Sequence, residues 1–285
     1  MIPPLLQFRF VRFCVTALTA LLLAGCANRV FYQPARRWAD TPDARGRVYQ
    51  PVAFNASDGV RLTGWWLPAE GPSKGTVVHF HGNAQNMSTH VQFAEWLPQS
   101  GYNLFVFDYR GYGKSGGRPG RPGLVRDGVA ALRTAAERAG EDPNLFVWGQ
   151  SLGGTVALHA LLHTDVPVRG AVIDSTFYSH PAITADKLKH FPWYLQWLRL
   201  FRPILVTAGF DAADAVPQLP NLPLAFLHME EDPIVPSTHS RRLYERAPGS
   251  PRLWIIPGRG HADAVLRHPN QVRPLLLHFF ETNAR

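Results

Sequence analysis

Short apolar runs that alternate with helix-like segments constrain the fold of this chain more than any other feature. Such nearly continuous runs are expected of parallel strands that are buried on both faces of a sheet. Segments with helical periodicity separate most of them, and this alternation predicts an α/β fold, a mostly parallel sheet with helices on both faces. The expected strands are Thr76 to Phe80, Asn103 to Phe107, Leu145 to Trp148, Val168 to Ile173, Leu222 to Leu227 and Leu253 to Ile256, and the expected helices are Ser88 to Gln99, Leu124 to Ala139, Leu152 to Leu162, Ser237 to Arg246 and His268 to Glu281.

Two departures from this alternation predict additions to the sheet. Val48 to Phe54 and Val60 to Leu67 read as strands, and the Asp58-Gly59 pair between them is a strong hairpin signal. We therefore expect a leading antiparallel hairpin. Residues 176–220 carry no strand pattern, and we expect them to form a helical cap insertion over the carboxyl edge of the sheet. Its apolar side chains are candidates for an acyl pocket or for packing on the main domain; they are Phe191, Trp193, Tyr194, Trp197, Leu198, Leu200 and Phe201.

The strongest local signal lies at residues 149–154, which read Gly-Gln-Ser-Leu-Gly-Gly. This Gly-x-Ser-x-Gly pattern follows an expected strand and opens an expected helix, which is the context of a nucleophile elbow. The flanking glycines avoid side-chain clashes at the sharp turn that carries Ser151. We predict that Ser151 is a catalytic nucleophile, at the positive end of the dipole of the helix that follows.

A serine hydroxyl needs a base, and the base needs an orienting acid. His261 follows the last expected strand in a Gly-Arg-Gly-His stretch, so it is the predicted base, ahead of His228, which ends an earlier strand. Asp232 lies between serine and histidine in the chain order expected for such a triad. We predict it as the acid; the rival carboxylates are Glu230, Glu231 and Asp174.

The oxyanion of an acyl-transfer intermediate needs two hydrogen-bond donors. One is expected to be the backbone N–H of Leu152, directly after the nucleophile. The other is expected from the loop after Thr76 to Phe80, where the Asn83 N–H is the first choice and the Ala84 N–H the second. His81 in this loop is expected to stabilise the loop by hydrogen bonding.

Together these motifs resemble the α/β-hydrolase superfamily, over roughly Val48 to Arg285. The stretch Asp108 to Ser115 is similar to a branch that contains membrane-associated serine hydrolases, protein depalmitoylases and serine-aminopeptidase-like proteins. The resemblance implies hydrolysis of esters, thioesters or occasionally amides without a cofactor, and a structural turn rather than catalysis at Asp108. The motifs that carry it occur in the family's order: His81-Gly82-Asn83, Asp108 to Ser115, Gly149 to Gly153, Asp232 to Pro236 and Gly260-His261.

We therefore predict a serine hydrolase that cleaves carboxylic ester or thioester bonds through an acyl-enzyme on Ser151, with apolar acyl groups favoured by the aromatic cap. An acyltransferase or a serine amidase or peptidase would use the same residues. A non-catalytic lipoprotein that binds envelope components is the alternative from another class. No metal site is expected, because the histidines lack ligand spacing such as His-Glu-x-x-His.

The first 26 residues read as an export signal. Arg9 and Arg12 precede a short apolar run, Phe13 to Ala24, which is too short to span a bilayer comfortably. The run ends in Leu-Ala-Gly-Cys, which resembles the lipobox of bacterial lipoproteins and makes Cys26 the expected lipidation site. An uncleaved N-terminal anchor is the alternative. Residues 27–46 are expected to be a tether, and residues 47–285 the hydrolase domain.

The export signal and the lipobox-like stretch predict a membrane-anchored lipoprotein of the bacterial cell envelope that faces outside the cytoplasm. Charge and cysteine content fit this predicted location. Cys14 and Cys26 are the two cysteines, so the domain after the signal has no disulfide despite export. The formal net charge of +8 comes mostly from scattered arginines, without a Lys/Arg run or a nucleic-acid motif. We expect a membrane partner through Cys26 and no nucleic acid, and the sequence does not indicate an oligomeric state.

Overall fold

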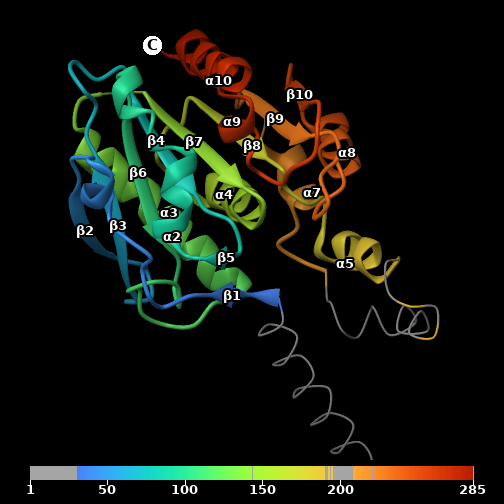
Figure 1. Ribbon diagram of the computed structural model, residues 1–285. Helices are drawn as coiled ribbons and strands as arrows, with labels where there is room; N and C mark the ends of the chain where they lie inside the picture. The colour runs from blue at the N-terminus through green and yellow to red at the C-terminus, as the bar shows by residue number, and fades with distance from the viewer. Residues whose placement is uncertain are drawn as a thin grey trace, which may run out of the picture.

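An eight-stranded sheet forms the centre of the molecule in the computed structural model, which describes residues 31–142, 144–189, 192, 194, 208–219 and 221–284 (Figure 1). The strands of this sheet are β2 (Gln50–Asn55), β3 (Arg61–Leu67), β4 (Thr76–Phe80), β6 (Asn103–Asp108), β7 (Leu145–Gln150), β8 (Gly170–Asp174), β9 (Leu224–Met229) and β10 (Arg252–Ile256). Their order is β10-β9-β8-β7-β4-β6-β3-β2.

The sheet confirms the predicted α/β-hydrolase architecture. The strands from β6 across to β10 pair in parallel, and β3 pairs antiparallel with both β2 and β6. The predicted hairpin is therefore present at one edge, where Gly59 adopts a φ of 78° in the turn. Because the parallel strands point the same way, their carboxyl ends meet along one rim of the sheet.

Helices cover both faces of the sheet. Alternate residues of a strand face opposite sides, so in β7 Val147 packs in one core and Trp148 in the other. The first core also contains side chains from α3 and α4, and the second contains side chains from α2, α9 and α10. The helices are α2 (Met87–His90), α3 (Arg121–Ala139), α4 (Leu152–His163), α5 (His180–Lys189), α7 (Ala212–Ala215), α8 (Thr238–Arg246), α9 (Ala264–Arg267) and α10 (Pro269–Asn283), with the 3-10 turns η1 (Pro42–Arg45), η2 (Val91–Phe93), η3 (Pro98–Ser100) and η5 (Val216–Gln218).

The predicted helix from Ser88 to Gln99 is wrong. The segment instead consists of the short helix α2 followed by η2 and η3. Proline has no backbone N–H and restricts the residue before it, so Pro98 ends any helix that could run to Gln99. Pro98 begins η3 instead.

The predicted tether over residues 27–46 is not a free linker from Phe31 onward. Residues Gln33–Pro34 form β1, which pairs in parallel with β5 (Ala84–Gln85), and Tyr32 is buried. Trp38 packs edge-on against Trp65 of β3, with ring centroids 4.9 Å apart. We call residues 31–45 the N-terminal strap, because they cross the surface of the domain and are held to it by these contacts.

The predicted cap insertion begins after β8 and ends before β9. Its described residues form α5, α7 and η5, which lie between β8 and β9 in the chain (Figure 1). Among the acyl-pocket candidates Tyr194 is described, and it is 59% exposed. The other acyl-pocket candidates, Phe191, Trp193, Trp197, Leu198, Leu200 and Phe201, lie outside the described residues.

The base of this insertion is fastened by a hydrogen-bonded contact between His180 and Asp211, which lie near its two ends. His180 Nδ1 lies 2.5 Å from Asp211 Oδ1, and the same carboxylate oxygen accepts the His180 backbone N–H. Both side chains are buried. The ring of Phe31 in the N-terminal strap lies 4.9 Å from the His180 ring, so the strap packs against the base of the insertion. Across the described ranges, no helix has the length and apolar character needed to cross a bilayer.

Candidate active site

Ser151 occupies a sharp turn between β7 and α4. Its φ of 52° and ψ of −116° are strained for a residue with a side chain. The turn also requires two glycines: a Cβ on Gly149 would lie 2.6 Å from the Gly154 Cα, and one on Gly153 would lie 2.0 Å from the Phe80 carbonyl oxygen. This geometry is that of a nucleophile elbow at the carboxyl rim of the sheet.

The structure brings the three predicted triad residues together. His261 follows β10 and its Nε2 lies 3.0 Å from Ser151 Oγ, so the hydroxyl can donate to the imidazole. Asp232 follows β9 and its Oδ2 accepts the His261 Nδ1–H at 2.7 Å. The His261 side chain is 17% exposed, while that of Asp232 is fully buried. The serine and imidazole can therefore be reached from solvent, and the acid is screened from it.

Asp232 is held as a carboxylate by an unusually complete set of donors. Its Oδ1 accepts the backbone N–H groups of Ile234 and Val235, at 2.8 and 2.9 Å. Burial by itself would raise the pKa of Asp232, but hydrogen bonds from His228 and His261 outweigh it and hold that pKa well below its usual range. The acid therefore remains ionised wherever the enzyme works.

His228, the weaker candidate for the base, is a partner of the acid instead. It is fully buried; its Nε2 lies 2.8 Å from the Val235 carbonyl oxygen and 3.2 Å from Asp232 Oδ2. Its Nδ1 lies 2.7 Å from Ser240 Oγ of α8. His228 thus braces the loop that presents Asp232. The sequence signal was its position at the end of β9, four residues before that acid.

The rival carboxylates lie elsewhere. Glu230 and Glu231 are exposed. Asp174 ends β8 and is fully buried, and its partners are Gln150 Nε2 at 3.2 Å and Ser175 Oγ at 3.0 Å. Asp174 therefore reaches the same region as the triad without taking the place of Asp232.

The loop after β4 is tied to the N-terminal strap through Asn83. The Asn83 Oδ1 accepts the Gln33 backbone N–H at 3.2 Å and the Tyr112 hydroxyl at 3.0 Å, and its Nδ2 donates to the Phe31 carbonyl oxygen. These bonds involve only the Asn83 side chain, and its backbone N–H stays the predicted second oxyanion donor. Leu152, the first residue of α4, has an N–H in the helix turn that lacks intrahelical acceptors.

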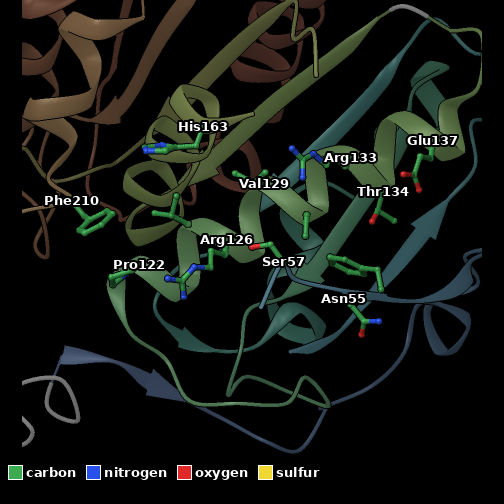
Figure 2. Close-up of a pocket in the computed structure, with 13 residues that line it drawn as sticks. Asn55, Ser57, Pro122, Arg126, Val129, Arg133, Thr134, Glu137, His163 and Phe210 are labelled. Carbon is green, nitrogen blue, oxygen red and sulfur yellow. The ribbon is translucent and has the colours of Figure 1, made fainter. Parts of the chain in front are cut away.

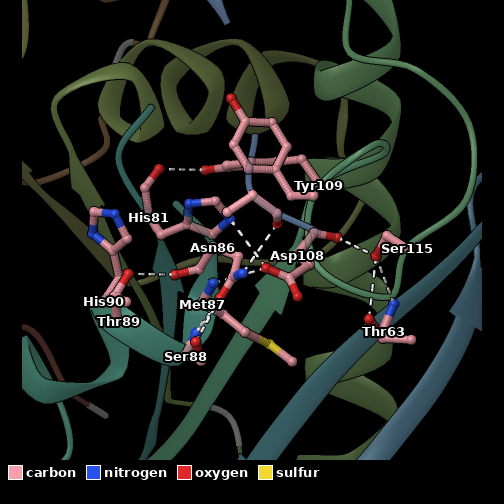
Figure 3. A network of polar contacts seen from close by, with 12 residues as sticks. Thr63, His81, Asn86, Met87, Ser88, Thr89, His90, Asp108, Tyr109 and Ser115 are labelled. Atoms are coloured by element: carbon pink, nitrogen blue, oxygen red, sulfur yellow. Dashed lines mark hydrogen bonds and ion pairs between the residues drawn. The ribbon is translucent and has the colours of Figure 1, made fainter. Parts of the chain in front are cut away.

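The turn around Asp108 belongs to a network of polar contacts beside the loop that follows β4 (Figure 3). Asp108 Oδ1 accepts the Met87 backbone N–H at 2.7 Å, and its Oδ2 accepts the indole N–H of Trp38 in the strap at 2.9 Å. Burial raises the pKa of Asp108 to about 6, against these hydrogen bonds. Ser115 Oγ donates to the Asp108 carbonyl oxygen and accepts the Thr63 N–H, so the stretch fastens the strap and β3.

His81 lies in the same network and behaves as a loop residue. The His81 Nδ1 is 2.8 Å from the Gly82 carbonyl oxygen, and the His81 carbonyl oxygen accepts the Tyr109 hydroxyl at 3.1 Å. Burial lowers its pKa well below the usual range for histidine. A neutral, hydrogen-bonded imidazole fits the predicted role in stabilising the loop.

Two hollows lie near α3 and α4. The narrower one, of about 10 Å³, contains Leu152, and its lining combines apolar and polar side chains: Tyr32, Leu124, Val125, Val156, Phe210, Arg121, Thr155, His159 and His180. The wider one is a groove along α3 that contains Ser57, Arg126 and Glu137 and no member of the triad (Figure 2). Within the described ranges, no three His, Cys, Asp or Glu side chains gather as metal ligands would.

Comparison with known proteins places this geometry in a family. Residues 71–216, from before the oxyanion loop through the nucleophile elbow and into the cap insertion, match the family model described as serine aminopeptidase, S33. The chain belongs to this family of α/β hydrolases. Its relatives include the uncharacterized protein YfhR of Escherichia coli K12, which is 33% identical over 98% of this chain and 94% of its own.

More distant relatives of this α/β hydrolase come from eukaryotes. The α/β hydrolase domain-containing protein WAV2 of Arabidopsis thaliana is 28% identical over 86% of this chain and 84% of its own. Among solved structures, the Pyrococcus furiosus esterase Pf2001 superposes with a TM-score of 0.71 at 22% identity, covering 90% of this chain and 98% of that one. An esterase from Exiguobacterium antarcticum gives a TM-score of 0.59 at 18% identity, covering 81% and 99%. These structures share the fold, and the family makes the protein a hydrolase.

Proposed function

We propose that the protein is a serine hydrolase that cleaves carboxylic ester or thioester bonds through an acyl-enzyme on Ser151. The observation that carries the proposal is the continuous hydrogen-bond chain from the Ser151 hydroxyl through His261 to Asp232, at 3.0 and 2.7 Å. As Ser151 Oγ attacks the acyl carbon, His261 Nε2 takes its proton, and Asp232 stabilises the imidazolium that forms.

Collapse of the tetrahedral intermediate expels the leaving group, which receives the proton from His261. Water then attacks the acyl-enzyme, with His261 again acting as base, and releases the acid. The negative oxygen in both steps would be held by the backbone N–H groups of Leu152 and Asn83. Loss of one such donor costs roughly 100- to 1000-fold in rate.

Apolar acyl groups are the proposed substrates. The support for this class is the apolar and aromatic composition of residues 191–201 in the cap insertion. The hollow that contains Leu152 is too small, at about 10 Å³, to hold an acyl chain in this structure. The family model's description as serine aminopeptidase favours a serine peptidase as the second candidate. Transfer of the acyl group to an alcohol would use the same intermediate. A purely envelope-binding protein would have no use for the triad geometry.

The proposed location is the bacterial cell envelope, with the protein anchored by lipid on Cys26 and facing outside the cytoplasm. The order of basic residues, apolar run and lipobox-like stretch supports it. Acyl lipids at the membrane surface would then lie within reach of the active site.

A fluorophosphonate probe tests the mechanism, because it phosphonylates a serine that a neighbouring base activates. The wild-type protein should be labelled, Ser151→Ala should not, and Ser57→Ala should be labelled like the wild type. Ser57 lies in the groove along α3 and serves as the matched serine control (Figure 2). A wild-type protein that resists the probe would refute the proposed mechanism.

A series of p-nitrophenyl esters tests the substrate class. We expect kcat/KM to rise from acetate to medium-length acyl chains as methylene groups become buried against the protein, by up to roughly fourfold for each methylene that becomes fully buried. Cleavage of acetate alone would refute the preference for apolar acyl groups. Faster release from aminoacyl amides than from esters would favour the peptidase.

A further inference from the structure

Four hydrogen bonds close a ring around the residue that follows the catalytic histidine. The Ala262 N–H donates to Ser175 Oγ at 3.1 Å, and Ser175 Oγ–H donates to Asp174 Oδ1 at 3.0 Å. On the other side, Gln150 Nε2 donates to the Ala262 carbonyl oxygen at 2.8 Å and to Asp174 Oδ2 at 3.2 Å. Both peptide groups that flank the Ala262 Cα are therefore fixed from inside the protein.

The donors and acceptors in the ring can be assigned from its members. Asp174 accepts on both oxygens, which fits a carboxylate, and burial raises its pKa against those two hydrogen bonds. The Gln150 amide is oriented by His79, whose Nε2 lies 2.8 Å from Gln150 Oε1. Burial lowers the pKa of His79 to about 3, so this imidazole is neutral and donates its one proton to that oxygen. Gln150 must then direct its N–H groups toward Asp174 and Ala262.

Backbone strain indicates that the ring acts on the histidine loop. Ala262 and Ser175 have φ values of 53° and 51°, in the left-handed region that residues with side chains rarely adopt. Such conformations persist only where their surroundings hold them. The ring supplies that restraint with Gln150, Asp174 and Ser175 almost completely buried, and Ala262 is bonded directly to His261 along the chain.

We propose that Gln150, Asp174 and Ser175 are positioning residues that hold the His261 loop by both peptide groups of Ala262, so that the imidazole stays aligned between Ser151 and Asp232. The proposal rests on the function proposed above and assigns a role to the residue before the nucleophile and to the carboxylate at the end of β8. None of the three residues touches the substrate. Their effect is on the alignment of the base, and it belongs to the chemical step rather than to substrate binding.

Two variants open the ring on opposite sides. Ser175→Ala removes the acceptor of the Ala262 N–H, and Gln150→Met removes the donor to the Ala262 carbonyl oxygen while keeping side-chain length. Displacing a catalytic group by about 1 Å costs roughly 100-fold in rate, so we expect each variant to lower the maximal rate of Ser151 phosphonylation by roughly 10- to 100-fold. The probe concentration that gives half of that rate should remain within about twofold of wild type, because binding is untouched.

Ser115→Ala is the matched control. Ser115 is also a fully buried serine whose Oγ accepts a backbone N–H and donates to an oxygen, within the network of Figure 3. Its loss should lower Tm about as much as Ser175→Ala does, and the maximal phosphonylation rate should fall by less than in either ring variant, because the Ser115 side chain bonds to Asp108 and Thr63 and not to the His261 loop. A rate for Ser175→Ala and Gln150→Met equal to that of the control would overturn the positioning role.

The outcomes separate the two proposals. If the wild type is not labelled, the proposed function fails and the ring has no base to position. If the wild type is labelled and the ring variants are labelled as fast, the ring proposal alone fails. Should Ser175→Ala not fold, Gln150→Met carries the test; if neither folds while Ser115→Ala does, the ring is structural and the proposal is overturned.

Discussion

At the scale of single residues, His79 both orients Gln150 beside the active site and affects how stability depends on pH in acid. It is a fully buried residue of β4, and its pKa falls to about 3 because burial disfavours the charged imidazole. In the unfolded chain a histidine titrates near 6.5. Between these two values the unfolded state binds more protons than the folded state, so folding stability is complete above about pH 6.5 and is lost as the pH falls.

His79→Leu should therefore flatten the acid side of the stability profile. We expect its unfolding free energy to depend less on pH between pH 6.5 and pH 4, by up to about 1.4 kcal/mol per pH unit. At pH 8 the variant should be less stable by about 1 to 3 kcal/mol, since Gln150 Oε1 loses its donor. Urea unfolding at several pH values measures both effects.

Trp148→Phe is the control for this substitution. The Trp148 ring lies 5.4 Å from the His79 ring, so the change disturbs the same core without removing a titratable group. Its profile should have the wild-type slope at lower overall stability. A His79→Leu slope equal to that of wild type would contradict the role given to this histidine.

At the scale of elements, the pairing of β1 with β5 attaches the N-terminal strap to the loop that we propose for the oxyanion hole. Asn83 is the residue that connects them, through hydrogen bonds to the backbone of Phe31 and Gln33. Asn83→Ala removes these bonds and leaves the backbone N–H that we assign to the oxyanion hole. We expect kcat to fall roughly 10- to 100-fold through misplacement of that donor, with KM little changed.

Tyr112→Phe separates the strap from the rest of the Asn83 contacts. It removes the hydrogen bond from the Tyr112 hydroxyl and keeps both bonds to the strap. Steady-state kinetics on one p-nitrophenyl ester should show a much smaller loss for Tyr112→Phe than for Asn83→Ala. Equal losses would mean that the strap does not hold the donor in place.

The sequence predicts an element most accurately where burial alone determines its residue pattern. The bounds of β4, Thr76 to Phe80, agree with the prediction, because Val77, Val78 and Phe80 give the nearly continuous apolar run expected of a strand buried on both faces. The packing of the strap on the domain is not predicted, because its polar residues suggest a linker. The aromatic side chains of Phe31, Tyr32 and Trp38 are the signal in the sequence that could have indicated it. The helix expected to run to Gln99 ends at His90, and Pro98 accounts only for the absence of its last turn.

The site shows the same division. The sequence predicted that Ser151, Asp232 and His261 would meet, because each follows a strand whose carboxyl end lies on one rim, and the structure places them in contact. The ring at Ala262 joins residues 150, 174 and 175 to residue 262 through side-chain geometry that no local motif encodes. Asp174 was weighed as a rival acid for the same reason that it can reach the ring: it ends the neighbouring strand.

At the scale of the whole molecule, the residues that form the cores and the residues of the proposed active site lie in different places. The two cores lie on either face of the sheet, while the triad, the Ala262 ring and the oxyanion loop gather on the carboxyl rim. The N-terminal region adds the one proposed attachment to a membrane. That attachment should be separable from catalysis, because the domain from Phe31 onward carries the entire triad.

Cys26→Ala should move the protein from the membrane fraction to the soluble fraction and end incorporation of labelled fatty acid. Cys14→Ala, which changes the other cysteine of the leading segment, should do neither. Phosphonylation of Ser151 should be equal in both variants and in the wild type. Retention of Cys26→Ala in the membrane fraction would favour an uncleaved N-terminal anchor over the lipid.

The contact between the strap and Asn83 also limits how far the active site could stand from a bilayer. Five peptide steps lead from Cys26 to Phe31, and a fully extended chain covers at most about 3.6 Å per step, or about 18 Å. An enzyme held that close would meet its substrates in two dimensions. Its turnover would then follow the surface density of acyl lipids around each anchored molecule, and dilution of the surrounding fluid would leave it unchanged.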